Sequence, residues 1–184
     1  MGAHIALRVR LLVLASGLAL LAVAATAAQA RPDFTGRWKL ARLEVDTTMP
    51  VSSEPAPFYP QALTVTLEGE MPSPVLTVER RAQDDVRTDV FRIGVTEGMT
   101  SGFLRGVSGT GGAGGSSSSQ SADWKGATLV IKKQRSDVAA DGRVTRALRN
   151  ETWSLDARGQ LVIVVSDQTN DDEPRRATLT FRRQ

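Results

Sequence analysis

Hydrophobic and polar residues alternate along most of the chain beyond residue 30. Leu63, Val65 and Leu67 are separated by threonines, and residues 177–181 repeat this pattern near the C-terminus. A period of two residues is typical of strands with one buried face, and no segment beyond residue 30 sustains a helical period. The pattern predicts about eight strands, at residues 34–45, 63–67, 75–81, 86–95, 128–134, 144–155, 161–166 and 177–181.

Short turn sequences separate several of these strands. Asp141-Gly142 is a two-residue hairpin signal, and Gly159 ends a turn that begins at Asp156. Such turns join neighbouring antiparallel strands, and closing the resulting meander into a barrel removes its two exposed edges. We therefore expect an all-β fold, an antiparallel meander that closes into a barrel, formed by residues 31–184 as a single domain.

A tract rich in glycine and serine interrupts the strand pattern between residues 96 and 121. Eleven of the fourteen residues at 108–121 are Gly or Ser, a composition that cannot bury apolar surface. We expect a flexible loop at about residues 106–121. Phe103 precedes it, next to Leu104. The Phe103 side chain could contact a ligand as part of a lid over the barrel mouth, or it could pack on the rim of the barrel.

Residues 1–30 have a different character. They include Arg8 and Arg10, continue through an apolar run at residues 11–28 and end at Ala28-Gln29-Ala30. This order is typical of a cleaved secretory signal peptide, and a retained membrane anchor is the alternative that the length of the run leaves open. Cleavage before Arg31 would place residues 31–184 in the periplasm or outside the cell, with no membrane span.

The residue types beyond position 30 exclude several kinds of chemistry. The only histidine is His4, and the chain has no cysteine. Serine catalysis with a histidine base is therefore excluded for residues 31–184, as are zinc sites of His and Cys. Adjacent acidic residues at 84–85 and 171–173 are more typical of solvated turns than of calcium loops, whose ligands are alternately spaced. We predict no catalytic residue, no metal and no cofactor.

The charge pattern argues against a nucleic-acid partner. The whole chain has a formal charge of +3, and the segment after residue 30 has about +1 because Arg8 and Arg10 are lost. Basic residues alternate with acidic ones along that segment, whereas nucleic-acid binding requires a clustered basic surface. The sequence does not indicate an oligomeric state.

A Gly-x-Trp motif, Gly36-Arg37-Trp38, opens the first predicted strand. Tryptophans that precede hairpins follow at residues 122–126 and 153–156. In these motifs the chain resembles exported bacterial lipocalin-like proteins, within the broader calycin-like group. The resemblance covers most of residues 31–184 and implies a lipocalin-like barrel.

The resemblance also implies structural roles near the barrel base. Trp38, with Gly36 beside it, would close the base. An arginine of the last strand would pack across Trp38, and we expect this to be Arg182, with Arg183 as the neighbouring alternative.

The strand predicted at residues 144–155 has charged residues on the face expected to be buried. Arg149 and Glu151 share that face with Trp153 if the strand is regular. A charge that points into a barrel needs a partner or a polar ligand group. Arg149 is a candidate anchor for a carboxylate or phosphate, with Glu151, Trp153 and Phe103 as further ligand-binding residues. An internal ion pair, or a bulge that turns both charges outward, is the alternative.

These observations favour an exported protein that binds a small apolar or amphiphilic molecule and is not an enzyme. Two other functions stay open. An interaction module of the cell envelope would have an exposed apolar groove. A carboxylate-dependent hydrolase would have a pair of inward-facing Asp or Glu side chains.

The first prediction concerns processing. If residues 1–30 are a signal peptide, the protein isolated from its own cells should begin at Arg31 and be released in soluble form by osmotic shock. N-terminal sequencing of that fraction checks this, and recovery of Met1 in a membrane fraction would contradict it.

Overall fold

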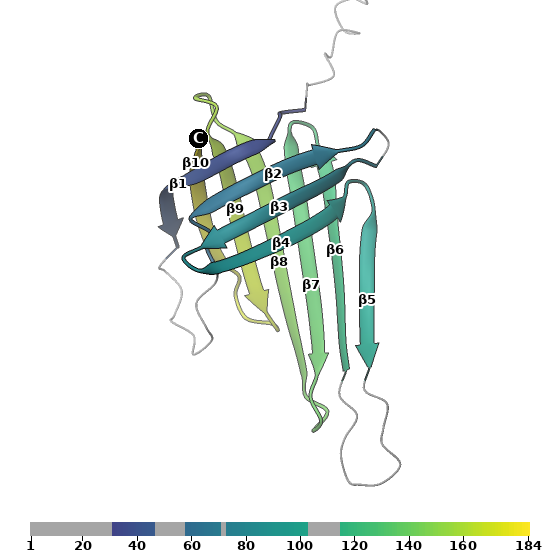
Figure 1. The fold of residues 1–184 in the computed structure, drawn as a ribbon. Coiled ribbons are helices and arrows are strands. Elements are labelled where there is room, and N and C mark those ends of the chain that lie inside the picture. The colour runs from purple at the N-terminus through teal and green to yellow at the C-terminus, as the bar shows by residue number, and fades with distance from the viewer. Residues whose placement is uncertain (1–30, 47–57, 71–72, 103–114) are drawn as a thin grey trace, which may run out of the picture. The chain divides into compact units, whose positions relative to one another are not determined.

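The computed structural model describes residues 31–46, 58–70, 73–102 and 115–184, whose fold is drawn in Figure 1. They form a single sheet in which each strand is hydrogen-bonded to its neighbours in the order β4-β3-β2-β1-β10-β9-β8-β7-β6-β5. Among these residues no helix has the length and hydrophobicity of a membrane span. The ten strands are β1 (Gly36–Val45), β2 (Ala62–Glu68), β3 (Val75–Ala82), β4 (Asp85–Arg92), β5 (Thr96–Gly102), β6 (Gly115–Lys125), β7 (Thr128–Val138), β8 (Val144–Leu155), β9 (Leu161–Thr169) and β10 (Arg175–Arg183).

The antiparallel meander is as expected, but it has ten strands where the alternation predicted about eight. The additional strands are β5 and β6, and residues 115–121 of the expected loop belong to β6, where they pair with residues 132–138 of β7. The remainder of that loop, like Phe103, lies outside the described residues. The serine-rich part of β6 is a strand because its backbone bonds to β7, and its partly exposed side chains need no apolar face.

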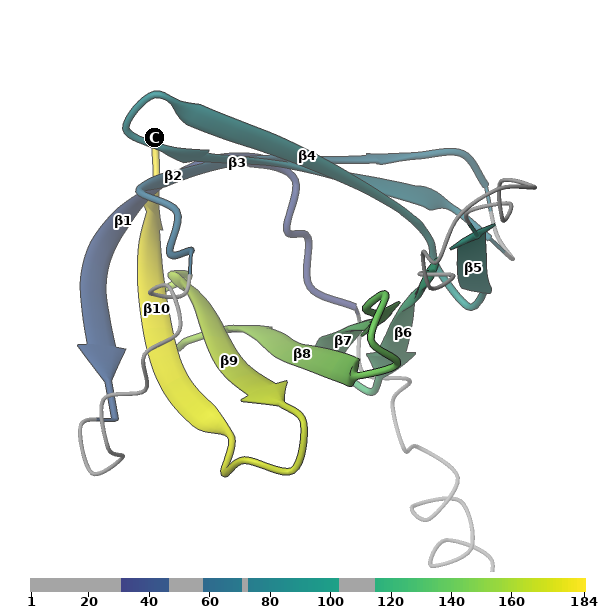
Figure 2. The same ribbon diagram turned by 90° about the horizontal axis from the view of Figure 1, so that it is seen from below.

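The sheet curves until β1 and β10 pair with each other, so the barrel is nearly closed (Figure 2). The remaining seam lies between the edge strands β4 and β5. At the start of β5, contacts run from the end of β4 to β6: the Gly94 amide donates to the Ala122 carbonyl of β6 at 2.9 Å, next to an isolated bridge between Ile93 and Ala122. The side-chain amide of Gln120 donates to the Val90 carbonyl at 2.7 Å. These contacts take the place of a continuous ladder.

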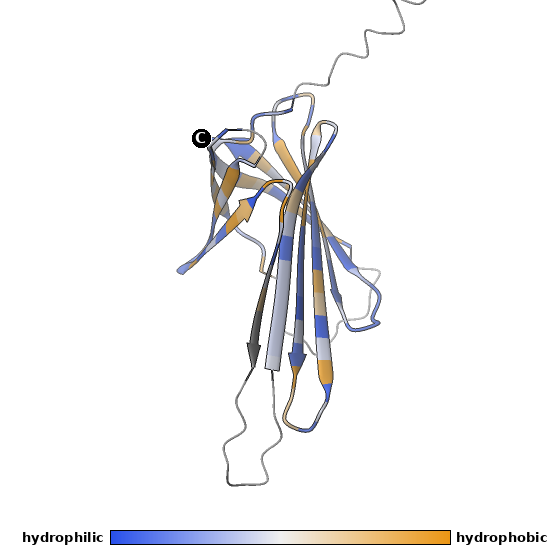
Figure 3. Ribbon diagram, turned by 90° about the vertical axis from the view of Figure 1, so that its right-hand side faces the viewer, coloured by the Kyte–Doolittle hydropathy of each residue, from blue (hydrophilic) through white to orange (hydrophobic). Residues whose placement is uncertain are grey.

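Hydrophobic and hydrophilic residues alternate along much of the strands (Figure 3). Inward-facing residues that are paired in the ladders between neighbouring strands form tiers. Direct partners in an antiparallel pair lie on the same face of the sheet. Most members of the apolar tier on β6 to β10 are almost completely buried. This apolar tier consists of Trp124, Leu129, Trp153, Ile163 and Leu179.

Trp38 is completely buried and is held by the segment that precedes β1. Its indole nitrogen donates to the Phe34 carbonyl oxygen at 2.9 Å. The Phe34 ring stacks on Trp124 with centroids 5.5 Å apart and meets Trp153 edge-on at 6.0 Å. The segment before β1 therefore packs against the aromatic residues of the apolar tier.

We expected Arg182 to pack over Trp38, but the structure has Arg183 in this contact. The Arg183 guanidinium lies 4.9 Å from the Trp38 ring centroid and also donates to the Asp33 carbonyl oxygen at 3.2 Å. Arg183 is opposite Trp38 in the ladder between β1 and β10, so the two share a face, whereas Arg182 is on the other face. Gly36 has a φ of +127°, a conformation that favours glycine.

The second prediction concerns Trp38. Trp38→Ala should lower the free energy of unfolding by about 3 to 5 kcal/mol, because it deletes a fully buried aromatic side chain. Urea unfolding followed by circular dichroism measures this. Leu43→Ala on the same strand, where the side chain is 40% exposed, is the control and should cost about 1 kcal/mol or less. Equal losses in the two variants would contradict a structural role for Trp38.

Candidate functional site

Beyond the apolar tier, the inward-facing positions of β6 to β10 change from apolar to charged. Each strand keeps its period-two alternation, so the face that buries the core also carries the charges. The next tier has a single charge: Ala122, Ile131, Glu151, Val165 and Ala177. The tier after it, which we call the charged floor, consists of Gln120, Lys133, Arg149, Asp167 and Arg175.

Glu151 is the centre of an ion-pair network inside the barrel. Its side chain is 1% exposed and accepts from Arg80 Nη2 and Arg149 Nε, both at 2.8 Å. The indole nitrogen of Trp153 donates to the same carboxylate at 3.0 Å. Because Arg80 comes from β3 and Glu151 from β8, the ion pair between them spans the barrel interior.

The network continues outward from this pair in two directions. On one side, Arg80 Nε donates to Asp89 on β4 at 2.9 Å, and Lys133 Nζ contacts the other oxygen of Asp89 at 2.5 Å. On the other side, Arg149 Nη1 donates to Asp167 on β9 at 3.0 Å. Three cations and three carboxylates therefore alternate in one continuous series of ion pairs, in the order Lys133, Asp89, Arg80, Glu151, Arg149 and Asp167. Among the described residues, every buried polar side-chain atom has a hydrogen-bond partner.

The network controls the protonation of its members. Burial pushes the pKa of Glu151 upward, but Arg80 and then Arg149 outweigh this effect and hold the pKa at about 2. Burial lowers the pKa of Lys133, and the hydrogen bond to Asp89 opposes that change. Burial raises the pKa of Asp167, with Arg149 opposing it. At neutral pH, Glu151 is thus a permanently charged partner of Arg80.

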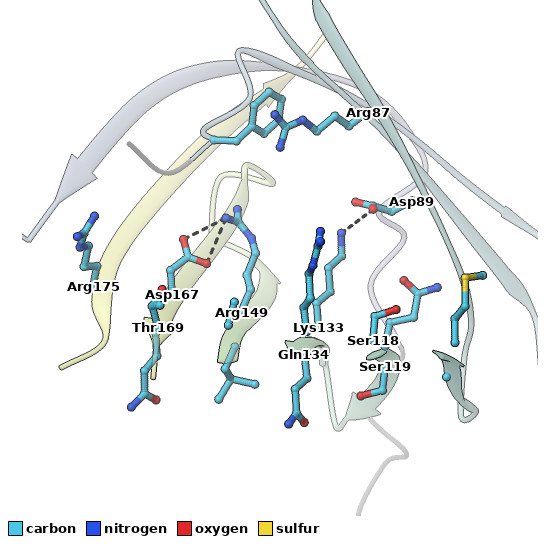
Figure 4. A pocket seen from close by; sticks show the side chains of 18 of the residues that line it. Arg87, Asp89, Ser118, Ser119, Lys133, Gln134, Arg149, Asp167, Thr169 and Arg175 are labelled. Atoms are coloured by element: carbon cyan, nitrogen blue, oxygen red, sulfur yellow. Dashed lines mark hydrogen bonds and ion pairs between the residues drawn. The ribbon is translucent and has the colours of Figure 1, made fainter. Parts of the chain in front are cut away.

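A cavity of about 1090 Å³ lies directly above the charged floor (Figure 4). Arg149 and Lys133 project side by side into it, each bound to its carboxylate. Ser118 and Ser119 of β6 and Thr169 of β9 are also in its lining. Apolar contact surface comes from Phe58, Met99, Ala147 and Leu148.

The structure confirms that Arg149, Glu151 and Trp153 share the inner face of β8. They lie at different depths, however: Arg149 lines the cavity, Glu151 is buried beneath it, and Trp153 belongs to the apolar tier. The internal ion pair, which the sequence left as an alternative, is present. Ligand binding by these residues stays a prediction, and Phe103 lies outside the described residues.

Sequence reasoning missed four members of the network: Arg80, Asp89, Lys133 and Asp167. Each was nevertheless detectable by alternation, because each lies two residues from a buried apolar side chain on the same strand. Those neighbours are Val78, Phe91, Ile131 and Val165, respectively. The same test that selected Arg149 and Glu151 would have selected these four residues as well.

Two of the three acidic residues in the loop between β9 and β10 line the cavity. Asp172 and Glu173 are among its lining residues. In the part of the chain that the structure describes, no three or more Asp or Glu side chains are grouped as a metal site would require.

Fold and site together define a nearly closed, all-antiparallel barrel with a cavity, an architecture consistent with a lipocalin-like barrel. No protein-family model matches the sequence, and no match is found among curated proteins. The function must therefore be argued from the site itself.

The third prediction is a pH dependence that belongs to Glu151. Its pKa is depressed from 4.5 to about 2 in the folded protein. Its contribution to stability is therefore present above about pH 4.5 and is lost as the pH falls toward 2. This contribution amounts to about 3 kcal/mol. The raised pKa of Asp167 acts in the opposite direction, so wild type must be compared with a variant.

Glu151→Gln should lower the free energy of unfolding at neutral pH by about 3 to 5 kcal/mol, because it leaves Arg80 without its buried partner. The difference from wild type should shrink between about pH 4.5 and 2. Urea unfolding across this range measures it. Glu44→Gln is the matched control: Glu44 is an exposed carboxylate paired with Arg42 and should change stability by less than about 1 kcal/mol. A difference for Glu151→Gln that is constant with pH would contradict the prediction.

Proposed function

We propose that this protein is an exported, lipocalin-like carrier that binds a small amphiphilic molecule in the cavity above the charged floor. The observation behind the proposal is the cavity itself, whose volume of about 1090 Å³ is close to the upper end of the usual range for small-molecule sites. A barrel filled by side chains to both ends would have no room for a ligand.

The lining favours an amphiphilic ligand over a purely apolar one. Phe58, Met99, Ala147 and Leu148 offer apolar contact, while the floor and β6 offer hydrogen-bonding groups. A purely apolar molecule would cover Lys133, Arg149 and their carboxylates without replacing the contacts that water makes with them, at a cost in free energy. The mechanism is sequestration by burial, with no bond made or broken.

The fourth prediction tests occupancy of the cavity. Native mass spectrometry of protein purified from the organism that encodes it should detect a bound small molecule. Ala147→Trp should abolish or strongly reduce that signal, because Ala147 lines the cavity and an indole would fill part of its volume. The control is Thr152→Trp on the same strand, at an exposed position of the outer face, and it should retain the bound mass. Equal occupancy in both variants would place the ligand elsewhere, and a wild-type protein without any bound mass would contradict the proposal.

A further inference from the structure

Two of the three cations of the charged floor, Arg149 and Lys133, project into the cavity and are already bound to carboxylates. Arg149 uses Nε for Glu151 and Nη1 for Asp167. Lys133 is bound to Asp89 at 2.5 Å. A ligand anion could bind Arg149 or Lys133 strongly only by displacing one of these carboxylates, which would then be left partly buried without its partner.

The charges of the whole cavity lining are balanced as well. Among the described residues it contains five basic side chains, from Arg87, Lys133, Arg135, Arg149 and Arg175, and five acidic ones, from Asp89, Glu97, Asp167, Asp172 and Glu173. A charged ligand that leaves water therefore finds no excess of opposite charge to compensate its desolvation. The remaining polar lining is uncharged and includes Ser118, Ser119, Gln120, Gln134, Gln168 and Thr169.

We infer that the head group of the bound molecule is uncharged and carries several hydroxyls, as in a polyol or sugar. A hydroxyl donates one hydrogen bond and accepts others. It can therefore donate to Asp167 or Asp89 while it accepts from Arg149 or Lys133, without breaking either ion pair. This inference rests on the proposed function, because it specifies the ligand of the same cavity.

The test compares four detergents with the same octyl chain: octyl glucoside, octyl sulfate, octyltrimethylammonium and a zwitterionic octyl sulfobetaine. Each is titrated into the wild-type protein below its critical micelle concentration and followed by calorimetry. Octyl glucoside should bind more tightly than each of the three others. Tighter binding of any charged or zwitterionic detergent would overturn the inference but leave a binding protein. Absence of binding by all four would count against the proposed function as well.

Asp167→Asn should shift this preference toward octyl sulfate, which is the fifth prediction. The substitution removes one negative charge and leaves Arg149 with less compensation, so octyl sulfate should bind about tenfold more tightly than it binds wild type. Octyl glucoside, which loses a charged acceptor, should bind about tenfold more weakly.

Asp123→Asn is the matched control, because Asp123 is exposed on β6 and is not among the residues that line the cavity. It should leave all four affinities unchanged. Circular dichroism establishes that both variants are folded, and if Asp167→Asn is not, Asp89→Asn applies the same test at Lys133. Unchanged selectivity in a folded Asp167→Asn protein would show that the floor does not select the head group.

Discussion

The ion pair between Arg80 and Glu151 connects two walls of the barrel that no backbone ladder joins. β3 and β8 are far apart in the order of the sheet, yet these two side chains meet at 2.8 Å with exposures of 5% and 1%. Neither charge can be left at this depth alone without a loss of several kcal/mol. The pair therefore requires the two walls to lie at a definite separation at this level of the barrel.

This pair also separates the core from the cavity. On one side of it, inward-facing residues are apolar and pack against Trp38 and Trp153. On the other side, the floor charges are partly exposed, with side-chain exposures of 20% for Arg149 and 24% for Asp167, because the space beyond them is not filled. An apolar residue in place of Glu151 would leave Arg80 with only Asp89, a carboxylate that Lys133 shares, so the network stabilises the structure best as a complete set.

Backbone ladders join the strands around most of the barrel but not between the edge strands β4 and β5. Residues of both edge strands line the cavity. β1 and β10 close one side through a long ladder, whereas the seam between β4 and β5 depends on contacts at Ala122 and Gln120. Gln120 belongs to the floor tier and also crosses the seam, so it links the cavity to the least hydrogen-bonded part of the wall. A wall segment with few backbone bonds opens at a smaller free-energy cost than a paired one.

The sequence by itself determined the type of fold and the inner face of most strands, because a period of two is a local property that each strand expresses without its neighbours. That is why Arg149, Glu151 and Trp153 could be placed on one face in advance. Only the tertiary structure decided which charges meet: Arg80 is 71 positions from Glu151 in the chain, and nothing local specifies such a partner. It also decided that a serine-rich tract forms β6, since that strand depends on pairing with β7. Alternation within β10 puts Arg183, not Arg182, on the inner face with Phe181, but only the register of β10 against β1 places Arg183 opposite Trp38.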